Sequence, residues 1–255
     1  MILASCGGAD SASETKIVGG TSPDSDDAVI KHTVALVDPT GEQFCTGTLV
    51  TSTWVVTAAH CLADYRDDAL YIAFGKVAKL GHFTREKLRG AAFAKVHEDF
   101  NPLALRLENP SFAPADIALV VLSEPAPEGH EPVAVMRAHN ETYVGETLLL
   151  AGYGVTSGFG GSSGDLLKVE TTLISKSADA KEFDFGESPG RSACRGDSGG
   201  PAFVYRGNQL ALLGVTSRGS YFCNNDGTYT DIRYYIDWII ETGREGSAAA
   251  TAAAN

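Results

Sequence analysis

One stretch of the sequence, CRGDSGGP from Cys194 to Pro201, holds residue types from which a nucleophilic site can be built. A serine hydroxyl alone is a weak nucleophile. It needs a base, and it needs hydrogen-bond donors that stabilise the negative charge developing on the substrate oxygen. The glycines of this stretch let the backbone bend sharply and approach a substrate closely. A Gly-rich run with Asp and Ser is also typical of a surface turn. The stretch therefore predicts a nucleophile at Ser198 only if partners occur elsewhere in the chain.

Two other segments supply such partners. His60 lies in the pentapeptide TAAHC, and Asp116 opens an apolar run in the pentapeptide ADIAL. Together with Ile17-Val18-Gly19-Gly20 and the GDSGGP sequence around Ser198, these segments resemble the trypsin/chymotrypsin-like serine proteases. The order His, Asp, Ser along the chain is that of the chymotrypsin type. The resemblance extends over roughly residues 17–243, and several separate motifs in the expected order make it specific.

The resemblance implies a role for each of these residues. Ser198 is expected to attack the peptide carbonyl, His60 to accept and later return its proton, and Asp116 to orient the imidazole. The backbone N–H groups of Gly196 and Ser198 are expected to form the oxyanion hole. Ser217 matches the residue that supports the aspartate and contacts the substrate backbone. The competing class is a catalytically silent relative used as a binding or adhesion module. Such relatives generally lack a triad residue or the activation site, and neither is missing here.

Residues 1–16 are interpreted as processing sequence. The family is cut at the position of Lys16–Ile17, and the resemblance implies that the new Ile17 ammonium then pairs with buried Asp197 beside the oxyanion hole. Burying a charge without a partner is costly, so the uncut chain should have a poorly formed site. We therefore expect a zymogen that depends on an activating protease. The alternative is that Ile17 merely begins an apolar strand.

The cysteines give two further expectations. Leu3-Ala4-Ser5-Cys6 matches a bacterial lipobox, but only Met1 and Ile2 precede it. Either the true start lies upstream and Cys6 carries a lipid anchor, or Cys6 is an ordinary free thiol.

The resemblance pairs the remaining cysteines as Cys45–Cys61 and Cys194–Cys223. Closing loops of this size adds about 3–4 kcal/mol each on the chain-entropy model. Structural disulfides imply an oxidising compartment, so we expect a secreted protein or one of the cell envelope, in the periplasm or at the outer membrane. The family's other frequent disulfides have no cysteines here, which fits a pared-down bacterial member.

Composition narrows the partners. The net charge of −12 argues against nucleic-acid binding, because no basic stripe is available to neutralise phosphates. No apolar run approaches the length of a transmembrane helix. The other histidines show no metal-ligand spacing, and we expect neither a metal nor a cofactor. The expected partners are protein or peptide substrates and the activating protease, and the chain is expected to be a monomer.

Short Val-, Leu- and Thr-rich runs separated by glycines and prolines predict an all-β fold. The resemblance implies two six-stranded antiparallel β-barrels of the chymotrypsin-like kind with a short C-terminal helix. Residues 17–125 should form the N-terminal barrel with His60 and Asp116. Residues 126–243 should form the C-terminal barrel and the helix, with Ser198, and residues 244–255 a disordered tail.

Strand-like runs occur at residues 32–38, 44–50, 53–57, 70–74, 91–96 and 117–122, and then at 147–151, 166–172, 201–205, 210–216 and 228–232. The proline-containing segment 100–115 is predicted to be a surface loop, and the segment 123–132 a linker between the barrels. Residues 234–242 have apolar residues at helical spacing and predict the C-terminal helix.

Specificity is predicted less sharply. The resemblance places Ser192 at the base of the substrate pocket and leaves its walls open at Gly219 and Gly227. Such a deep, neutral pocket favours a large apolar or aromatic side chain at P1, the substrate residue before the scissile bond. The alternative is a Lys or Arg at P1, because Asp226 in the short loop after Cys223 could bring a carboxylate near the pocket.

Arg218 stands where the family usually has an aromatic residue. With Arg195 it forms either a basic rim that favours acidic neighbours in the substrate, or an ordinary solvated surface. Both interpretations stay open at the level of sequence.

Overall fold

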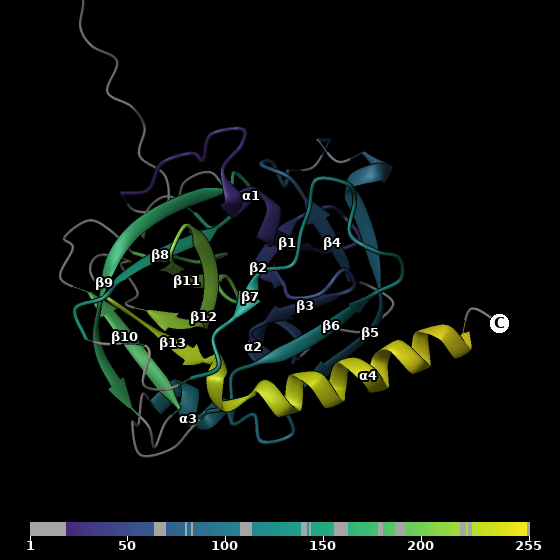
Figure 1. The fold of residues 1–255 in the computed structure, drawn as a ribbon. Coiled ribbons are helices and arrows are strands. Elements are labelled where there is room, and N and C mark those ends of the chain that lie inside the picture. The colour runs from purple at the N-terminus through teal and green to yellow at the C-terminus, as the bar shows by residue number, and fades with distance from the viewer. Residues whose placement is uncertain are drawn as a thin grey trace, which may run out of the picture.

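Strands form most of the regular structure in the computed structural model, and they build two barrels that lie side by side (Figure 1). The structure describes residues 19–63, 70–79, 81–82, 84–107, 114–138, 142, 144–155, 163–177, 181–186, 192–219, 223 and 226–253. Both barrels close with six strands each, and neighbouring strands around each barrel are antiparallel. The predicted fold class is confirmed.

The first barrel comprises β1 (Thr33–Val37), β2 (Gln43–Leu49), β3 (Trp54–Thr57), β4 (Tyr71–Phe74), β5 (Leu88–Val96) and β6 (Ala118–Leu122). It closes in the order β1-β2-β3-β6-β5-β4. Strand β6 reads ALVVL and is buried at every position. Such a continuous apolar run is expected where both faces of a strand are covered. Here a long C-terminal helix lies along the outside of β5 and β6 (Figure 1).

The second barrel comprises β8 (Thr147–Gly152), β9 (Leu167–Ser177), β10 (Glu182–Gly186), β11 (Pro201–Arg206), β12 (Gln209–Gly219) and β13 (Gly227–Asp231). It runs in the order β11-β8-β9-β10-β13-β12 and closes where β12 pairs with β11. A short strand, β7 (Ala134–Val135), adds to β12 in parallel. Residues 123–132 connect the barrels without helix or strand, as expected of a linker.

Strand β10 was not predicted from the sequence. Its apolar pattern is interrupted by charge, because the acidic residues Glu182 and Asp184 alternate with the buried rings of Phe183 and Phe185. These acidic side chains have partners on β13, which neighbours β10, and on β12, the strand beyond it. Thr228 of β13 donates to Asp184 at 2.8 Å, and Arg218 of β12 pairs with Glu182. The strand is therefore stabilised by contacts that a local pattern does not contain.

Helices are few among the described residues: α1 (Ala28–His32), α2 (Ala59–Leu62), α3 (Pro102–Leu107), α4 (Ile236–Ala253) and the 3₁₀ turns η2 (Arg85–Lys87) and η4 (Ile232–Tyr234). Helix α3 corrects the prediction that residues 100–115 form only a loop. The Asn101 side chain accepts the N–H groups of Leu103 and Ala104, both at 3.0 Å. Asparagine before a proline at the first helical position is a favourable helix start.

Helix α4 corrects the prediction of a disordered tail at residues 244–255, because it continues to Ala253. Alanine is the strongest helix former, and the helix also packs on the first barrel. An added Cβ at Gly243 would lie 2.5 Å from the Trp54 ring, and Trp54 Nε1 donates to Ser247 Oγ at 2.9 Å. No helix among the described residues has the length and apolar character needed to cross a bilayer.

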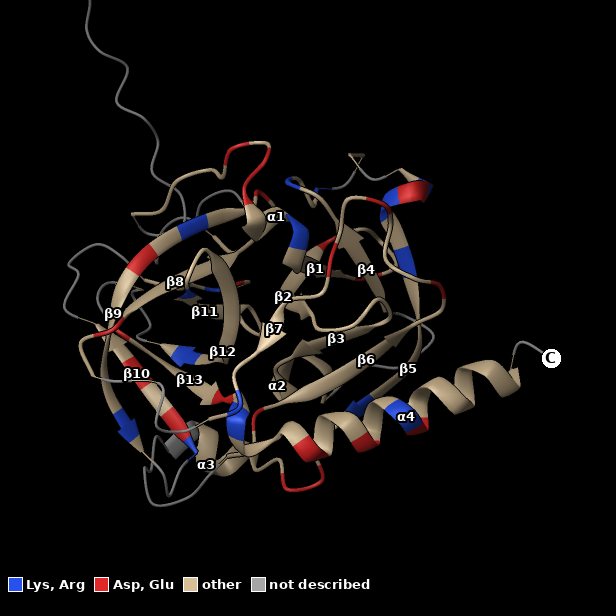
Figure 2. Cartoon of the chain, in the orientation of Figure 1, with Lys and Arg blue, Asp and Glu red and all other residues tan. Residues whose placement is uncertain are grey.

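Charged residues of both signs are spread over the two barrels and the helix, as Figure 2 shows. Acidic and basic residues both occur along α4 and β9, and acidic residues predominate in the chain as a whole.

Candidate active site

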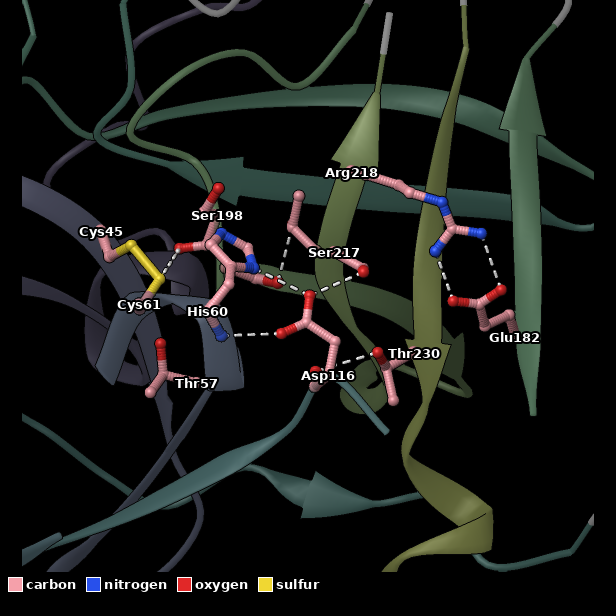
Figure 3. A network of polar contacts seen from close by, with 12 residues as sticks. Cys45, Thr57, His60, Cys61, Asp116, Glu182, Ser198, Ser217, Arg218 and Thr230 are labelled. Atoms are coloured by element: carbon pink, nitrogen blue, oxygen red, sulfur yellow. Dashed lines mark hydrogen bonds and ion pairs between the residues drawn. A yellow bond between two sulfur atoms is a disulfide. The ribbon is translucent and has the colours of Figure 1, made fainter. Parts of the chain in front are cut away.

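The carboxylate of Asp116 is the centre of a hydrogen-bond network that joins the two barrels (Figure 3). Asp116 is fully buried. Its Oδ1 accepts the backbone N–H of His60 at 2.9 Å, and its Oδ2 lies 2.8 Å from His60 Nδ1. From the second barrel, Ser217 Oγ donates to Oδ2 at 2.7 Å, and Thr230 Oγ1 donates to the Asp116 carbonyl at 3.0 Å. The carboxylate therefore accepts the Nδ1 proton and leaves the other ring nitrogen as an acceptor.

The contact with Asp116 changes the pKa of His60. Burial lowers the pKa of His60, but the negative charge of Asp116 and the hydrogen bond to it raise the pKa more strongly. The net pKa lies above the ordinary value. An imidazolium at His60 is thereby stabilised, which is what a base requires when it takes a proton during a reaction.

Local structure explains how His60 reaches this position. It lies in α2, one helical turn directly after β3, and the Cys45–Cys61 disulfide ties this turn to β2. The sulfur of Cys61 lies 3.7 Å from the carbonyl oxygen of Ser198. The His60 ring points one edge toward Asp116 and the opposite edge toward Ser198 (Figure 3). The second disulfide, Cys194–Cys223, also forms, as the resemblance implied.

Ser198 lies on a tightly folded loop. Asp197 N–H donates to the Cys194 carbonyl at 3.0 Å, and Gly200 N–H donates to the Asp197 carbonyl at 2.8 Å. Gly199 has a φ of +79°, and an added Cβ there would lie 2.1 Å from Thr57 Oγ1. Only glycine fits such a conformation at such a distance. The glycines of the motif are therefore needed to hold Ser198 against the first barrel.

The backbone N–H groups of Gly196 and Ser198 have no acceptor within the described part of the chain. Gly196 has a φ of +94°, and the Arg195 carbonyl on its N-terminal side accepts Val155 N–H at 2.8 Å. Two backbone donors beside a serine hydroxyl can together bind an oxygen that gains negative charge.

Asp197 is buried beneath this loop. Its Oδ1 accepts Gly154 N–H and its Oδ2 accepts Cys194 N–H, both at 2.8 Å. Burial raises the pKa of Asp197 to about 7, although the two N–H groups oppose the rise. An added Cβ at Gly152 would lie 2.1 Å from Asp197 Oδ1, so the carboxylate occupies the space that this glycine leaves. Lys16 and Ile17, the predicted activation residues, lie outside the described residues.

A cavity of about 230 Å³ adjoins Ser198. It is lined by Ala193, Cys194, Arg195, Ser198, Thr216, Arg218, Gly219 and Cys223. Of the predicted pocket residues, Arg218 and Gly219 belong to this lining. Ser192 and Gly227 are buried and do not.

The two buried pocket residues have other contacts. Ser192 Oγ donates to the backbone carbonyls of Ala193 at 3.0 Å and Asp226 at 3.3 Å. Asp226 thus meets Ser192 through its backbone. An added Cβ at Gly227 would lie 2.5 Å from the ring of Phe185 on β10, which explains why this position is a glycine.

Arg218 forms a bidentate ion pair that the sequence did not indicate. Its Nη1 and Nη2 donate to Glu182 Oε1 and Oε2 at 2.5 and 2.9 Å, and the two side chains are 18% and 5% exposed. Burial raises the pKa of Glu182, and the charge and hydrogen bonds of Arg218 oppose that rise. The charge of Arg218 is therefore compensated by Glu182 at the edge of the cavity, whereas Arg195, the other arginine of the lining, is exposed.

Sequence analysis also missed polar residues of the first barrel that contact the serine loop. Gln43 Nε2 and Thr46 Oγ1 both donate to the Gly196 carbonyl, at 2.9 and 2.8 Å. Glutamine and threonine in a strand carry no motif, so no local signal could have identified them. Their role depends on β2 lying against a loop some 150 residues later in the chain.

One grouping of described residues has the spacing of metal ligands: Cys45, His60 and Cys61. The two sulfurs are bonded to each other in a disulfide and are not thiolates. This set therefore does not fit a metal ion, which requires deprotonated cysteine ligands.

Comparison with known proteins agrees with this geometry. A family model described as Trypsin matches residues 17–239. Trypsin from Sus scrofa is 30% identical over 247 residues, which are 90% of this chain and 96% of that protein. Trypsin from Saccharopolyspora erythraea is 29% identical over 247 residues, covering 91% of this chain and 100% of that protein. Taken with the two barrels and the network around Asp116, these matches show that the chain belongs to the trypsin family of serine proteases.

Proposed function

We propose that the chain is an endopeptidase whose catalytic triad is His60, Asp116 and Ser198. The observation that carries this proposal is the placement of the His60 ring between the buried carboxylate and the serine (Figure 3). In this scheme His60 Nε2 takes the Ser198 proton as the hydroxyl oxygen attacks the peptide carbonyl. Nδ1–H stays bonded to Asp116, which stabilises the imidazolium.

The remaining steps follow from the same residues. The N–H groups of Gly196 and Ser198 bind the oxyanion of the tetrahedral intermediate. His60 then gives its proton to the leaving amine, and an acyl-enzyme forms on Ser198. Water, deprotonated by His60, releases the acyl group and restores the serine.

The test compares the parent chain with Ser198→Ala, both cleaved after Lys16. It measures reaction with an active-site probe and hydrolysis of a peptide. The parent should react with a fluorophosphonate probe and hydrolyse a peptide substrate. The variant should do neither while unfolding at the same urea concentration. If the cleaved parent chain is folded but neither reacts with the probe nor hydrolyses the peptide, the catalytically silent alternative is favoured.

The chain is further proposed to be a zymogen that an activating protease cuts at Lys16–Ile17. The support is Asp197, a fully buried carboxylate whose pKa is raised to about 7 and which pairs with no lysine, arginine or histidine in the described residues. A new ammonium at Ile17 would supply that cation. Lys16→Gln, which blocks the cut, should remain inactive, and Ile17→Gly should be cut yet weakly active. Full activity in either variant would contradict this mechanism.

The P1 preference is proposed to be large and apolar or aromatic. The support is that the described lining of the cavity beside Ser198 contains no acidic side chain, and that the neutral Ser192 hydroxyl contacts Asp226 through its backbone carbonyl. The alternative, Lys or Arg at P1, would involve Asp226. A peptide library that varies P1 decides between them, with Asp226→Asn as the matched variant. Cleavage after Lys or Arg that Asp226→Asn abolishes would establish the alternative.

The two disulfides and the family indicate an extracellular protein, because such bonds form and persist in oxidising compartments. Attachment to a cell envelope through a lipid on Cys6 is the finer proposal, and Cys6 lies outside the described residues. Intact-mass measurement of protein purified from its own cells tests it. A mass that corresponds to an unmodified Cys6 would contradict the lipid anchor and favour a freely secreted enzyme.

A further inference from the structure

The serine loop of the second barrel, residues 194–200, is held by Thr46 of the first barrel. This residue of β2 is fully buried, and all three of its polar groups form hydrogen bonds, two of them to the serine loop. Its N–H donates to the Ser198 carbonyl at 2.8 Å, and its hydroxyl donates to the Gly196 carbonyl at 2.8 Å. Its own carbonyl accepts the Thr57 hydroxyl at 2.8 Å.

The proton of the Thr46 hydroxyl has a defined direction. Tyr153 N–H donates to Thr46 Oγ1 at 3.2 Å, so the hydroxyl accepts from Tyr153 and donates onward to Gly196. Gln43 Nε2 donates to the same carbonyl at 2.9 Å and to the Cys45 carbonyl at 3.0 Å. The Gly196 carbonyl thus has two donors from one strand of the first barrel.

This anchoring matters because Gly196 is a glycine at φ +94°, and glycine has the softest backbone dihedrals in the chain. The preceding peptide is fixed by Val155 N–H, which donates to the Arg195 carbonyl at 2.8 Å. With the carbonyls of Arg195 and Gly196 both held, the direction of the Gly196 N–H between them is determined. That N–H is one of the two donors proposed for the oxyanion.

We infer that Thr46 is a positioning residue for the oxyanion hole. Its hydroxyl holds the Gly196–Asp197 peptide, which restrains the soft φ and ψ angles of Gly196 and keeps the preceding peptide, with the Gly196 N–H, aligned with the developing charge. This role rests on the proposed function. A pre-aligned donor needs no reorganisation during the reaction, which is the source of its catalytic effect. Thr46 acts through Gly196 and does not itself touch the reacting atoms.

The chain contains a matched control on the same strand. Thr48 lies two residues further along β2, is also fully buried, and its hydroxyl has no partner among the described residues. Valine replaces threonine with nearly the same shape, so Thr46→Val and Thr48→Val each remove one buried hydroxyl. The Thr46 methyl group that lies near Gly200 is retained in the valine variant. Thr46→Ser restores the hydroxyl.

The experiment compares the parent and the three variants, all cleaved after Lys16. In Thr46→Val, kcat should fall roughly ten- to a hundredfold with KM unchanged. This is less than the outright loss of an oxyanion donor, because the N–H is misaligned and not removed. Thr48→Val should match the parent in kcat, and Thr46→Ser should recover most of the loss.

Two further readouts separate positioning from general damage. A peptidyl trifluoromethyl ketone forms a tetrahedral oxyanion on the serine, whereas the corresponding alcohol does not. Thr46→Val should lower the affinity for the ketone about as much as it lowers kcat, and leave the affinity for the alcohol unchanged. It should also raise the pKa of the ketone adduct, measured by ¹⁹F NMR. An equal loss of affinity for the ketone and for the alcohol would overturn the inference.

Hydrogen exchange of the peptide spanning Cys194 to Gly200 provides a readout that needs no catalysis. Exchange should accelerate in Thr46→Val and not in Thr48→Val. Equal exchange and equal kcat in these two variants would overturn the positioning role while leaving the proposed function intact. If exchange is faster in Thr46→Val than in Thr48→Val but the parent chain does not hydrolyse peptides, the anchoring would be established and the proposed function contradicted.

Discussion

The Ser217 hydroxyl of the second barrel donates a 2.7 Å hydrogen bond to the buried Asp116 carboxylate of the first barrel. This bond and the one from Thr230 to the Asp116 carbonyl fix the aspartate from the opposite barrel. The orientation of His60 therefore depends on how the two barrels pack together, and not only on the segment that carries it.

Ser217→Ala should lower stability by about 1.5–3 kcal/mol, because it removes a buried hydrogen bond to a charged group. It should also reduce kcat, since the Asp116 carboxylate gains freedom to rotate away from His60. Urea unfolding and kinetics on one peptide substrate measure the two effects. Ser192→Ala is the control, because that buried hydroxyl contacts neutral backbone carbonyls among the described residues, and its loss should cost about 0.5–1.5 kcal/mol. Equal losses in the two variants would show that the charge of Asp116 is not involved.

The pH profile should report the raised pKa of His60. A base must be neutral, so kcat/KM should fall as the pH drops through a pKa above 6.5. Asp116→Asn should move this pKa downward and lower kcat by roughly 10⁴. His82→Gln, at an exposed position, should leave the profile unchanged. A profile that does not shift in Asp116→Asn would assign the titration to another group.

The same pKa of His60 has a consequence for folding. A histidine whose pKa is raised in the folded state adds stability that is fully present below its unfolded value of about 6.5. That contribution is lost as the pH rises through the folded pKa. The difference in unfolding free energy between the parent chain and Asp116→Asn should therefore shrink from pH 5 to pH 8.

Asp197 predicts a pH dependence of the same sign as that of His60, at lower pH, in the uncut chain. Its folded pKa of about 7 lies above its unfolded value of 3.8, so the folded state holds a proton that the unfolded state has released. Stability should then fall as the pH rises from about 4 through 7. Asp197→Asn should remove this slope, whereas Asp237→Asn on exposed α4 should keep it. After cleavage at Lys16 the slope should diminish, and an unchanged slope would argue against an Ile17 ammonium beside Asp197.

Gly243 gives a test of why α4 continues past the expected end of the helix. Helix propensity alone predicts that Gly243→Ala stabilises the helix by about 1 kcal/mol. The added Cβ would lie 2.5 Å from the Trp54 ring, so we expect a loss of about 1–3 kcal/mol instead. Ala249→Gly on the exposed face should cost about 1 kcal/mol through propensity. Stabilisation by Gly243→Ala would mean that the helix does not pack closely on the barrel.

Much of the fold could be predicted from local patterns because the barrel strands are short apolar runs between turn residues. The run ending at Leu122 is an example, since its continuous burial corresponds to its continuous apolar sequence. Strand β10 could not be predicted in this way. Its acidic residues are stable in a barrel only because they have partners such as Thr228 on the adjacent strand and Arg218 on the strand beyond it.

The sequence by itself determined His60, Asp116 and Ser198 as candidates, because each lies within a contiguous motif. These motifs carried the resemblance to the family, and the resemblance in turn implied the two barrels and both disulfides. Tertiary structure alone decided that Glu182 compensates Arg218, that α4 reaches Ala253, and that Thr46 holds the Gly196 carbonyl. The physical reason is common to all three. Each depends on contacts between residues far apart in the chain. The energy of such contacts depends on burial and distance, and neither quantity exists until the barrels have closed and packed together.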